Sequence, residues 1–230
     1  MKLSNETVSV LKNFSTINQN LVIKSGNKIA TMSAMKNIVA KAEVIEEFPQ
    51  EFAIYDLNEF LASISLFVNP DLDFHNDFVI ITENGDKSNK FLKYWFSDPS
   101  VVTTPQKQIS MPSTEVSFNL NSDVLSQTQK AAAIIGVPDM CLESMSLGKA
   151  TLKVTDKKND TANDYGVGID VNNADGKDLP YKFWFKVENL KLMPGTYDVS
   201  LSSKKISYFK NTKVDIDYFI ALEPESSYNE

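Results

Sequence analysis

The sequence contains no arginine, a single cysteine and a single histidine. All 23 cationic side chains are therefore lysines. Without the guanidinium fork, which binds a phosphate or a guanine edge with two hydrogen bonds, base-specific reading of DNA loses its commonest side chain. Cys141 alone cannot form an intramolecular disulfide, and His75 alone lacks the neighbours that a zinc site or a catalytic triad requires. We interpret His75 as a turn residue and Cys141 as a small core residue.

Long apolar runs are also absent. No segment approaches the roughly 20 apolar residues of a membrane span, and residues 1–6 have no apolar stretch behind Lys2 of the kind that a secretory signal needs. We therefore expect a protein that stays in the reducing cytoplasm where it is made, with no membrane partner.

Motifs that carry catalysis are missing as well. The sequence has no Gly-Lys-Ser/Thr phosphate loop, no Gly-x-Ser-x-Gly nucleophile elbow and no His-Glu-x-x-His zinc pair. Adjacent carboxylates such as Glu46 and Glu47 have no partner that would define a reaction, and we interpret them as a solvated face. The sequence thus predicts a protein that is not an enzyme, with no metal and no cofactor.

The chain does contain two amphipathic helices, about half a chain apart. Apolar residues recur at helical spacing over residues 4–16, and again over residues 121–134 before Gly136. The net charge of −7 argues at first against nucleic acid, but it does not exclude local basic faces. The polar face of the first helix carries Lys2, Asn5, Ser9, Lys12 and Thr16, and that of the second carries Ser126, Gln127 and Lys130.

Further pairs of similar segments follow the two helices in the same order, which favours an internal duplication. A strand at 52–57 runs into a helix at 58–67, and a strand at 183–187 runs into a shorter helix at 188–192. Each half then closes with an apolar strand and an acid–proline step, at Asp98–Pro99 and at Glu223–Pro224.

Strand patterns dominate between the helices, so we predict an α+β protein of two domains with similar topology. The boundary is expected in the proline-containing stretch 97–114, which gives domains 1–108 and 109–230. Trp95 and Trp184 lie in strand patterns that are typical of the core.

Residues 1–26 strongly resemble the sliding clamps of T-even-type phages, the processivity factors of their DNA polymerases. Further blocks resemble the same family in the same order, and the similarity covers the full length. These blocks are Ala53–Leu61, Asp98–Val102, Met193–Tyr197 and Ala221–Glu223.

The resemblance implies a closed homotrimeric ring of two-domain subunits, in which helices line the hole and sheets form the outer wall. It also implies sequence-independent binding of duplex DNA in the host-cell cytoplasm. The implied partners are a replicative DNA polymerase, an ATP-driven clamp loader and late-transcription factors. An acidic exterior repels DNA from outside the ring, which makes the charge of −7 compatible with this function.

In such a ring the polar faces of the two helices meet the DNA. We expect Lys2, Lys12 and Lys130 to face the phosphates, with Asn5, Ser9 and Gln127 as uncharged neighbours. Asn5 stands where the family tends to have a base, so the lining is expected to be less positive. The candidates to compensate, on nearby strands, are Lys24, Lys28, Lys149 and Lys153.

The resemblance further implies an apolar cleft near the domain connector, where short C-terminal peptides of partner proteins dock. All the candidate residues are equally suited to core or linker packing. They are Val101, Val102, Ile109, Met111, Pro112, Leu222 and Pro224.

Two other functions remain open at this point. The main alternative is a structural virion protein, because phage tail and baseplate subunits are also acidic, β-rich and symmetric. The second is a single-strand-binding module, which would need an exposed aromatic groove with basic flanks. The expected core positions of both tryptophans argue against it.

Overall fold

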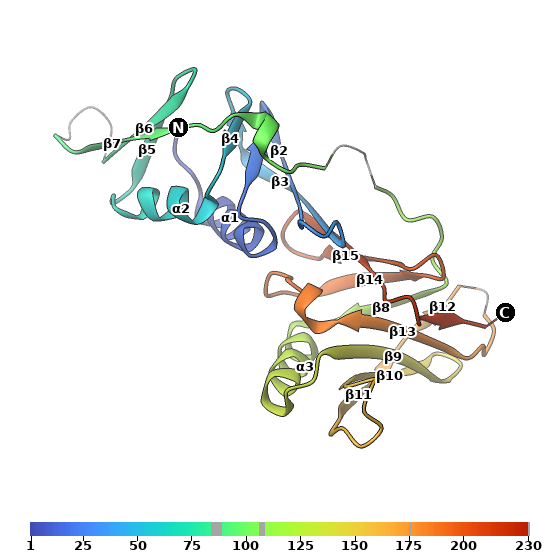
Figure 1. The fold of residues 1–230 in the computed structure, drawn as a ribbon. Helices are drawn as coiled ribbons and strands as arrows, with labels where there is room; N and C mark the ends of the chain where they lie inside the picture. Colours follow the sequence, from blue (N-terminus) through green and yellow to red (C-terminus); the bar gives the residue numbers. More distant parts are fainter. Residues whose placement is uncertain (84–88, 106–108, 175, 230) are drawn as a thin grey trace. The chain divides into compact units, whose positions relative to one another are not determined.

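The computed structural model describes residues 1–83, 89–105, 109–174 and 176–229. The chain divides into two compact units, Met1–Lys107 and Gln108–Glu230, and Figure 1 labels the elements of each. The domain boundary that we expected involves residue 108, which lies outside the described residues.

The first unit combines helices with antiparallel sheets, in keeping with the predicted α+β class. Within it, the strands of one sheet lie in the order β3-β2-β1-β4, and those of another lie in the order β5-β6-β7. Its elements are α1 (Asn5–Ile17), β1 (Leu21–Ile23), β2 (Gly26–Met32), β3 (Ile38–Phe48), β4 (Phe52–Ile54), α2 (Leu57–Ser65), β5 (Pro70–Phe74), β6 (Phe78–Glu83), β7 (Phe91–Trp95) and η2 (Pro99–Val101).

The second unit is built in the same way. One of its sheets has the order β12-β8-β14-β15-β16 and the other has the order β11-β10-β9-β13-β17. Its elements are β8 (Val116–Leu120), α3 (Ser122–Ile135), β9 (Asp139–Ser146), β10 (Lys149–Thr155), β11 (Tyr165–Asp170), β12 (Asn172–Asn173), β13 (Tyr181–Lys186), η3 (Val187–Asn189), β14 (Tyr197–Ser202), β15 (Ile206–Asn211), β16 (Ile216–Ala221) and β17 (Ser227–Tyr228).

Both amphipathic helices lie within one residue of their predicted ranges, because local capping fixes their ends. The Ser4 hydroxyl accepts a hydrogen bond from the Thr7 N–H at 3.1 Å and caps α1. The Asn121 side chain accepts one from the Val124 N–H at 2.8 Å and caps α3. Gly136 then ends α3 in the left-handed region, with φ of 70°, where glycine carries no Cβ penalty.

The helix predicted at 188–192 is wrong. The chain forms only the short 3₁₀ turn η3 there. Leu190 leaves the helical region (φ −82°, ψ 54°), and its carbonyl accepts a hydrogen bond from the Gln129 side chain at 2.9 Å. Pro194, four residues on, has no N–H to donate to this carbonyl, so a helix cannot continue here and a tertiary contact to α3 satisfies the carbonyl instead.

The interpretation of Glu46 and Glu47 as a solvated face is wrong for Glu46. Burial alternates along the end of β3, so Val44, Glu46 and Phe48 point inward while Ile45 and Glu47 are exposed. Only 8% of Glu46 is exposed. The signal was present in the sequence, because a strand with period two places residue 46 on the same face as residues 44 and 48.

Trp95 is not a core residue, as we had expected, because its strand alternates as well. Its exposed fraction is 60%, and that of Phe91 on the same strand is 69%. Tyr94 points the other way and packs edge to face on Phe60, with ring centroids 5.1 Å apart. Trp184 is half-buried.

The lone cysteine and the lone histidine occupy the positions that we predicted. Cys141 is buried in β9, and its burial raises the pKa of its thiol to about 12, which keeps it protonated and unreactive at neutral pH. His75 lies in the turn between β5 and β6, where its ring stacks on Phe78 with centroids 4.5 Å apart.

Candidate nucleic-acid interface

The helix α1 presents one uninterrupted polar face. Its core side is formed by Thr7, Val10, Leu11, Phe14 and Ile17, which are all buried. On the opposite side the predicted DNA-facing residues are exposed, as is Thr16. These exposed residues are Lys2 just before the helix and Asn5, Ser9 and Lys12 on it.

The polar face of α3 is shorter. Leu125, Thr128 and Ala132 are buried, whereas Gln127 and Lys130 are exposed. The Gln127 side chain accepts a hydrogen bond from the Tyr165 hydroxyl at 3.4 Å, so it lies against the first residue of β11. Both helices thus display their predicted residues to solvent.

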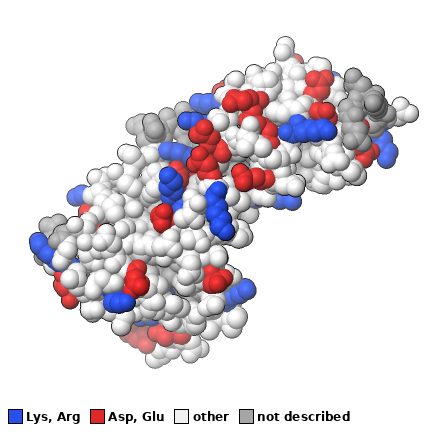
Figure 2. Space-filling model, turned by 180° about the vertical axis from the view of Figure 1, so that it is seen from behind, with Lys and Arg blue, Asp and Glu red and all other residues white. Residues whose placement is uncertain are grey.

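Lys12 and Lys130 form no ion pair with any described residue, so their charges are available to a ligand. Their surroundings are not strongly basic, because Glu6 and Asp123 are exposed in the first turns of α1 and α3. On the face drawn in Figure 2, lysines also lie among acidic side chains instead of forming one continuous basic patch. The arrangement suits weak contacts with phosphates better than tight binding.

The strand lysines expected to add positive charge are mostly paired. The Lys28 ammonium lies 3.7 Å from the Glu43 carboxylate, and Lys149 is paired with Asp170. Lys153 lies 3.8 Å from Glu143. Each pair joins neighbouring strands, so it depends on a strand register that the sequence did not provide.

The residues predicted to receive partner peptides differ widely in exposure. Val102 packs with Val22 and Ala53 in a buried cluster of the first unit, and Leu222 is 5% exposed. Both side chains belong to the core and offer almost no surface to a partner peptide in this structure. Val101, Pro112 and Pro224 are exposed, whereas Ile109 and Met111 are half-buried.

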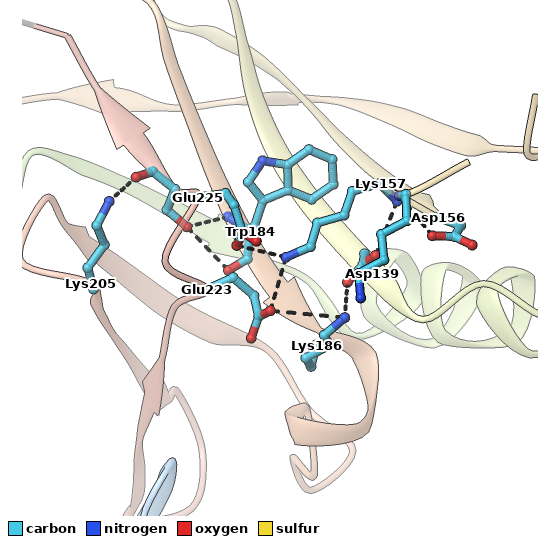
Figure 3. A network of polar contacts seen from close by, with 10 residues as sticks. Asp139, Asp156, Lys157, Trp184, Lys186, Lys205, Glu223 and Glu225 are labelled. Atoms are coloured by element: carbon cyan, nitrogen blue, oxygen red, sulfur yellow. Dashed lines mark hydrogen bonds and ion pairs between the residues drawn. The ribbon is translucent and has the colours of Figure 1, made fainter. Parts of the chain in front are cut away.

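The segment that follows Leu222 is held by a network of charged groups (Figure 3). The Lys157 ammonium lies 3.0 Å from Glu223 and 2.9 Å from Glu225. Burial lowers the pKa of Lys157, but hydrogen bonds to Glu225 and Glu223 outweigh it and hold that pKa above its ordinary value. The backbone N–H of Trp184 also donates a hydrogen bond to the Ser226 hydroxyl at 2.8 Å. Lys157 therefore anchors the C-terminal segment to the sheet that contains β13.

Replacing Lys157 by alanine is expected to loosen this segment. Only 9% of the Lys157 side chain is exposed, and its loss leaves the half-buried Glu223 without its nearest cation. We expect the free energy of unfolding to fall by about 1–3 kcal/mol, with faster amide hydrogen exchange over residues 223–229. Thermal unfolding and exchange measured beside the exposed neighbour variant Lys158→Ala check this, and equal behaviour of the two variants would contradict it.

Sequence reasoning missed a feature of two outer strands. In the first unit, β7 is one of the two outer strands of its sheet, and the Lys93 ammonium lies 3.7 Å and 4.1 Å from the ring centroids of Phe78 and Trp95, which are themselves 5.1 Å apart. In the second unit, β11 is one of the two outer strands of its sheet, and it lines a groove of about 710 Å³ together with residues of β8 and β14.

The described residues contain no group of three or more His, Cys, Asp and Glu side chains placed to hold a metal ion. None of the described helices is long and apolar enough to cross a membrane.

Comparison with known families matches both units. Residues 4–74 match the family model described as DNA polymerase processivity factor, and residues 117–224 match the model of the C-terminal part of the gp45 sliding clamp. The sliding clamp of Vibrio phage KVP40 is 36% identical over 228 residues, which cover 97% of this chain and 99% of that protein. The sliding clamp of Enterobacteria phage T4 is 29% identical over 237 residues and covers both chains completely.

Solved structures show the same fold at low sequence identity. Proliferating cellular nuclear antigen of Thermococcus kodakaraensis superposes with a TM-score of 0.70 at 16% identity, over 95% of this chain and 96% of that one. The Entamoeba histolytica protein of the same name gives a TM-score of 0.67 at 14% identity, over 95% of each chain.

Proposed function

This chain belongs to the family of phage sliding clamps, the processivity factors of DNA polymerases, and from this premise we propose that three copies join head to tail into a closed ring around duplex DNA. The family is not enzymatic, and the alternative of a structural virion protein is set aside. Such a ring keeps the polymerase on its template by topology, so its own contacts with DNA can be weak enough to permit sliding. We keep 1–108 and 109–230 as the two domains of each subunit.

The observation that carries the ring is the pair of outer strands β7 and β11. An uncovered strand edge presents unpaired N–H and C=O groups that another strand can bind. We propose that β7 of one copy enters the groove beside β11 of the next and extends its sheet. The exposed Phe91 and Trp95 would then be covered. Because the two surfaces differ, the contact repeats head to tail, and such a repeat closes into a ring only when the rotation between neighbouring copies divides the circle evenly. We propose closure at three copies.

The DNA-facing surface in this proposal is the polar side of α1 and α3. Lys2, Lys12 and Lys130 would contact phosphates, and Asn5, Ser9 and Gln127 would contribute uncharged hydrogen-bonding groups. The absence of arginine is compatible with this assignment, because it removes the side chain that most often reads a guanine edge, and a sliding protein must treat all sequences alike.

The family function implies DNA and a DNA polymerase as partners. We further propose an ATP-driven clamp loader and late-transcription factors as partners, and the host-cell cytoplasm as the location. For partner peptides, the residues to test are the accessible ones of the predicted set, namely Val101, Ile109, Met111, Pro112 and Pro224.

Two measurements on the purified protein test the proposal together. Sedimentation equilibrium is expected to give a mass three times that of one chain. A primer-extension assay with the cognate polymerase and loader is expected to give longer products when the protein is added. A monomer at every concentration, or products of unchanged length, would contradict the proposal.

A further inference from the structure

Glu46 is a carboxylate on the core side of the strand β3. It occupies an inward position of β3 between Val44 and Phe48, and only 8% of it is exposed. An ionised carboxylate in such a position is costly unless hydrogen-bond donors surround it. For Glu46 these donors lie at the start of α1.

Both oxygens of Glu46 bind the start of α1. Oε1 accepts a hydrogen bond from the Ser4 N–H, and Oε2 accepts one from the Thr7 hydroxyl. The Ser4 hydroxyl in turn donates to the Thr7 hydroxyl oxygen at 3.1 Å. Since an ionised carboxylate can only accept, the direction of this chain is fixed from Ser4 through Thr7 to Glu46.

The electrostatics agree with an ionised Glu46. Burial raises the pKa of its carboxyl, but the hydrogen bonds from Thr7 and Ser4 outweigh burial and hold the pKa below its ordinary value. A negative charge at the first turn of a helix is also favourable, because the helix dipole places partial positive charge there.

The two ends of α1 are held in different ways. Val10, Leu11, Phe14 and Ile17 fix the later turns by apolar packing. The first turn has only Thr7 in the core, and Thr7 is the residue that Glu46 binds. The location of the first turn therefore depends on Glu46. Lys2 is also held from its other side, because the Met1 ammonium lies 2.8 Å from Asp71 and the Leu72 N–H donates to the Met1 carbonyl at 2.7 Å, so its location depends on Glu46 in part. The location of Lys12 does not depend on Glu46.

We propose that Glu46 is a positioning residue for the DNA-facing surface: it fixes the first turn of α1 and so sets where Lys2 and Asn5 meet the phosphates. This assignment rests on the proposed function, in which α1 faces DNA. Glu46 itself is buried and does not touch the DNA.

Double-mutant cycles on the assembled protein separate positioning from general stability. The measured quantity is its affinity for a short linear duplex, whose free ends let a ring thread on and off, at several salt concentrations. Lys2→Ala is expected to weaken binding by about threefold and to flatten its salt dependence, as expected when a phosphate contact is lost. Glu46→Ala is expected to act in the same direction with a smaller effect. Combining the two should add little, because both remove the same contact. Combining Glu46→Ala with Lys12→Ala should multiply the two effects.

A matched control comes from Glu115 in the second unit. It accepts hydrogen bonds from the Ser203 N–H at 2.8 Å and from the Ser203 hydroxyl at 3.1 Å, so its loss removes a similar pair of bonds away from both helices. Glu115→Ala is expected to leave the affinity for the duplex unchanged. Glu46→Gln, which keeps one carbonyl oxygen in place of two carboxylate oxygens, is expected to give an intermediate affinity, and it replaces the alanine variant in the cycles if that variant does not fold.

Hydrogen exchange without DNA provides the second readout. Glu46→Ala is expected to speed exchange at Ser4, Thr7 and Val8, whose N–H groups are hydrogen-bonded at the start of α1, while residues 11–17 keep wild-type rates. The proposal is overturned if Glu46→Ala leaves the affinity for the duplex unchanged while Lys2→Ala weakens it, or if its effect multiplies equally with those of both lysine variants. If neither lysine variant weakens binding, the DNA-facing assignment of α1 itself fails, and the role of Glu46 fails with it.

Discussion

The double variant Lys12→Glu, Lys130→Glu is expected to weaken binding of the protein to a short linear duplex by about a hundredfold or more. In the proposed ring of three copies the change replaces six cations near phosphates by six anions, and like charges facing the backbone repel it. Because Lys12 and Lys130 are exposed and form no ion pair within the described residues, subunit folding and assembly should be unaffected. Fluorescence anisotropy of a labelled duplex, whose free ends let a ring thread on and off, measures the effect directly.

The control for this variant carries the same change of charge elsewhere. Lys210 and Lys213 are also exposed and belong to neither helix. Lys210→Glu with Lys213→Glu should keep an affinity for the duplex close to that of the wild type. If both double variants weaken binding equally, net charge and not the helix faces governs DNA binding, and the lining assignment is wrong.

The second large effect is expected at β7. Phe91→Asp together with Trp95→Asp should convert the trimer into monomers at micromolar concentration. Aromatic side chains at the centre of an interface each contribute about 2–4 kcal/mol to binding, and an aspartate buried without a partner adds a further penalty. Both residues are more than half exposed in the subunit, so its fold should survive. Sedimentation velocity beside circular dichroism distinguishes dissociation from unfolding.

Leu66→Asp is the matched control for this experiment, since Leu66 is 72% exposed in the same unit but lies at the end of α2. It should remain a trimer. A Phe91→Asp, Trp95→Asp protein that stays a trimer would show that β7 is not part of the subunit interface.

The sequence predicted the helices α1 and α3 better than any other part of this molecule. These two helices carry their start and stop signals locally, in Ser4, Asn121 and Gly136, so periodicity and capping were sufficient. The turn at Val187–Asn189 was misjudged because Pro194 cannot donate to the Leu190 carbonyl, which the side chain of Gln129, distant in sequence, binds instead.

The exposed side chains of the candidate site were predictable for a related reason. Helical spacing alone separates Asn5, Ser9 and Lys12 from the apolar stripe of α1. The charge balance around them was not predictable, because the pairing of Lys149 with Asp170 depends on the register of β10 against β11.

The strand β7 shows where apolar composition misleads. A run such as Tyr94–Trp95–Phe96 is typical of a buried strand, yet Trp95 is exposed because alternation along β7 turns it to the face opposite Tyr94. Glu46 is the opposite case, a charged residue that strand alternation places in the core. In both cases the period of the strand was more informative than the chemical type of the residue.

The central claim is topological retention, and one measurement tests it most directly. Labelled protein is loaded onto a nicked circular duplex, free protein is removed, and the circle is then cut at a single site. A closed ring is expected to persist on the circle and to leave soon after the cut by sliding off the free ends. Equal dissociation rates from the intact circle and from the cut DNA would contradict the account.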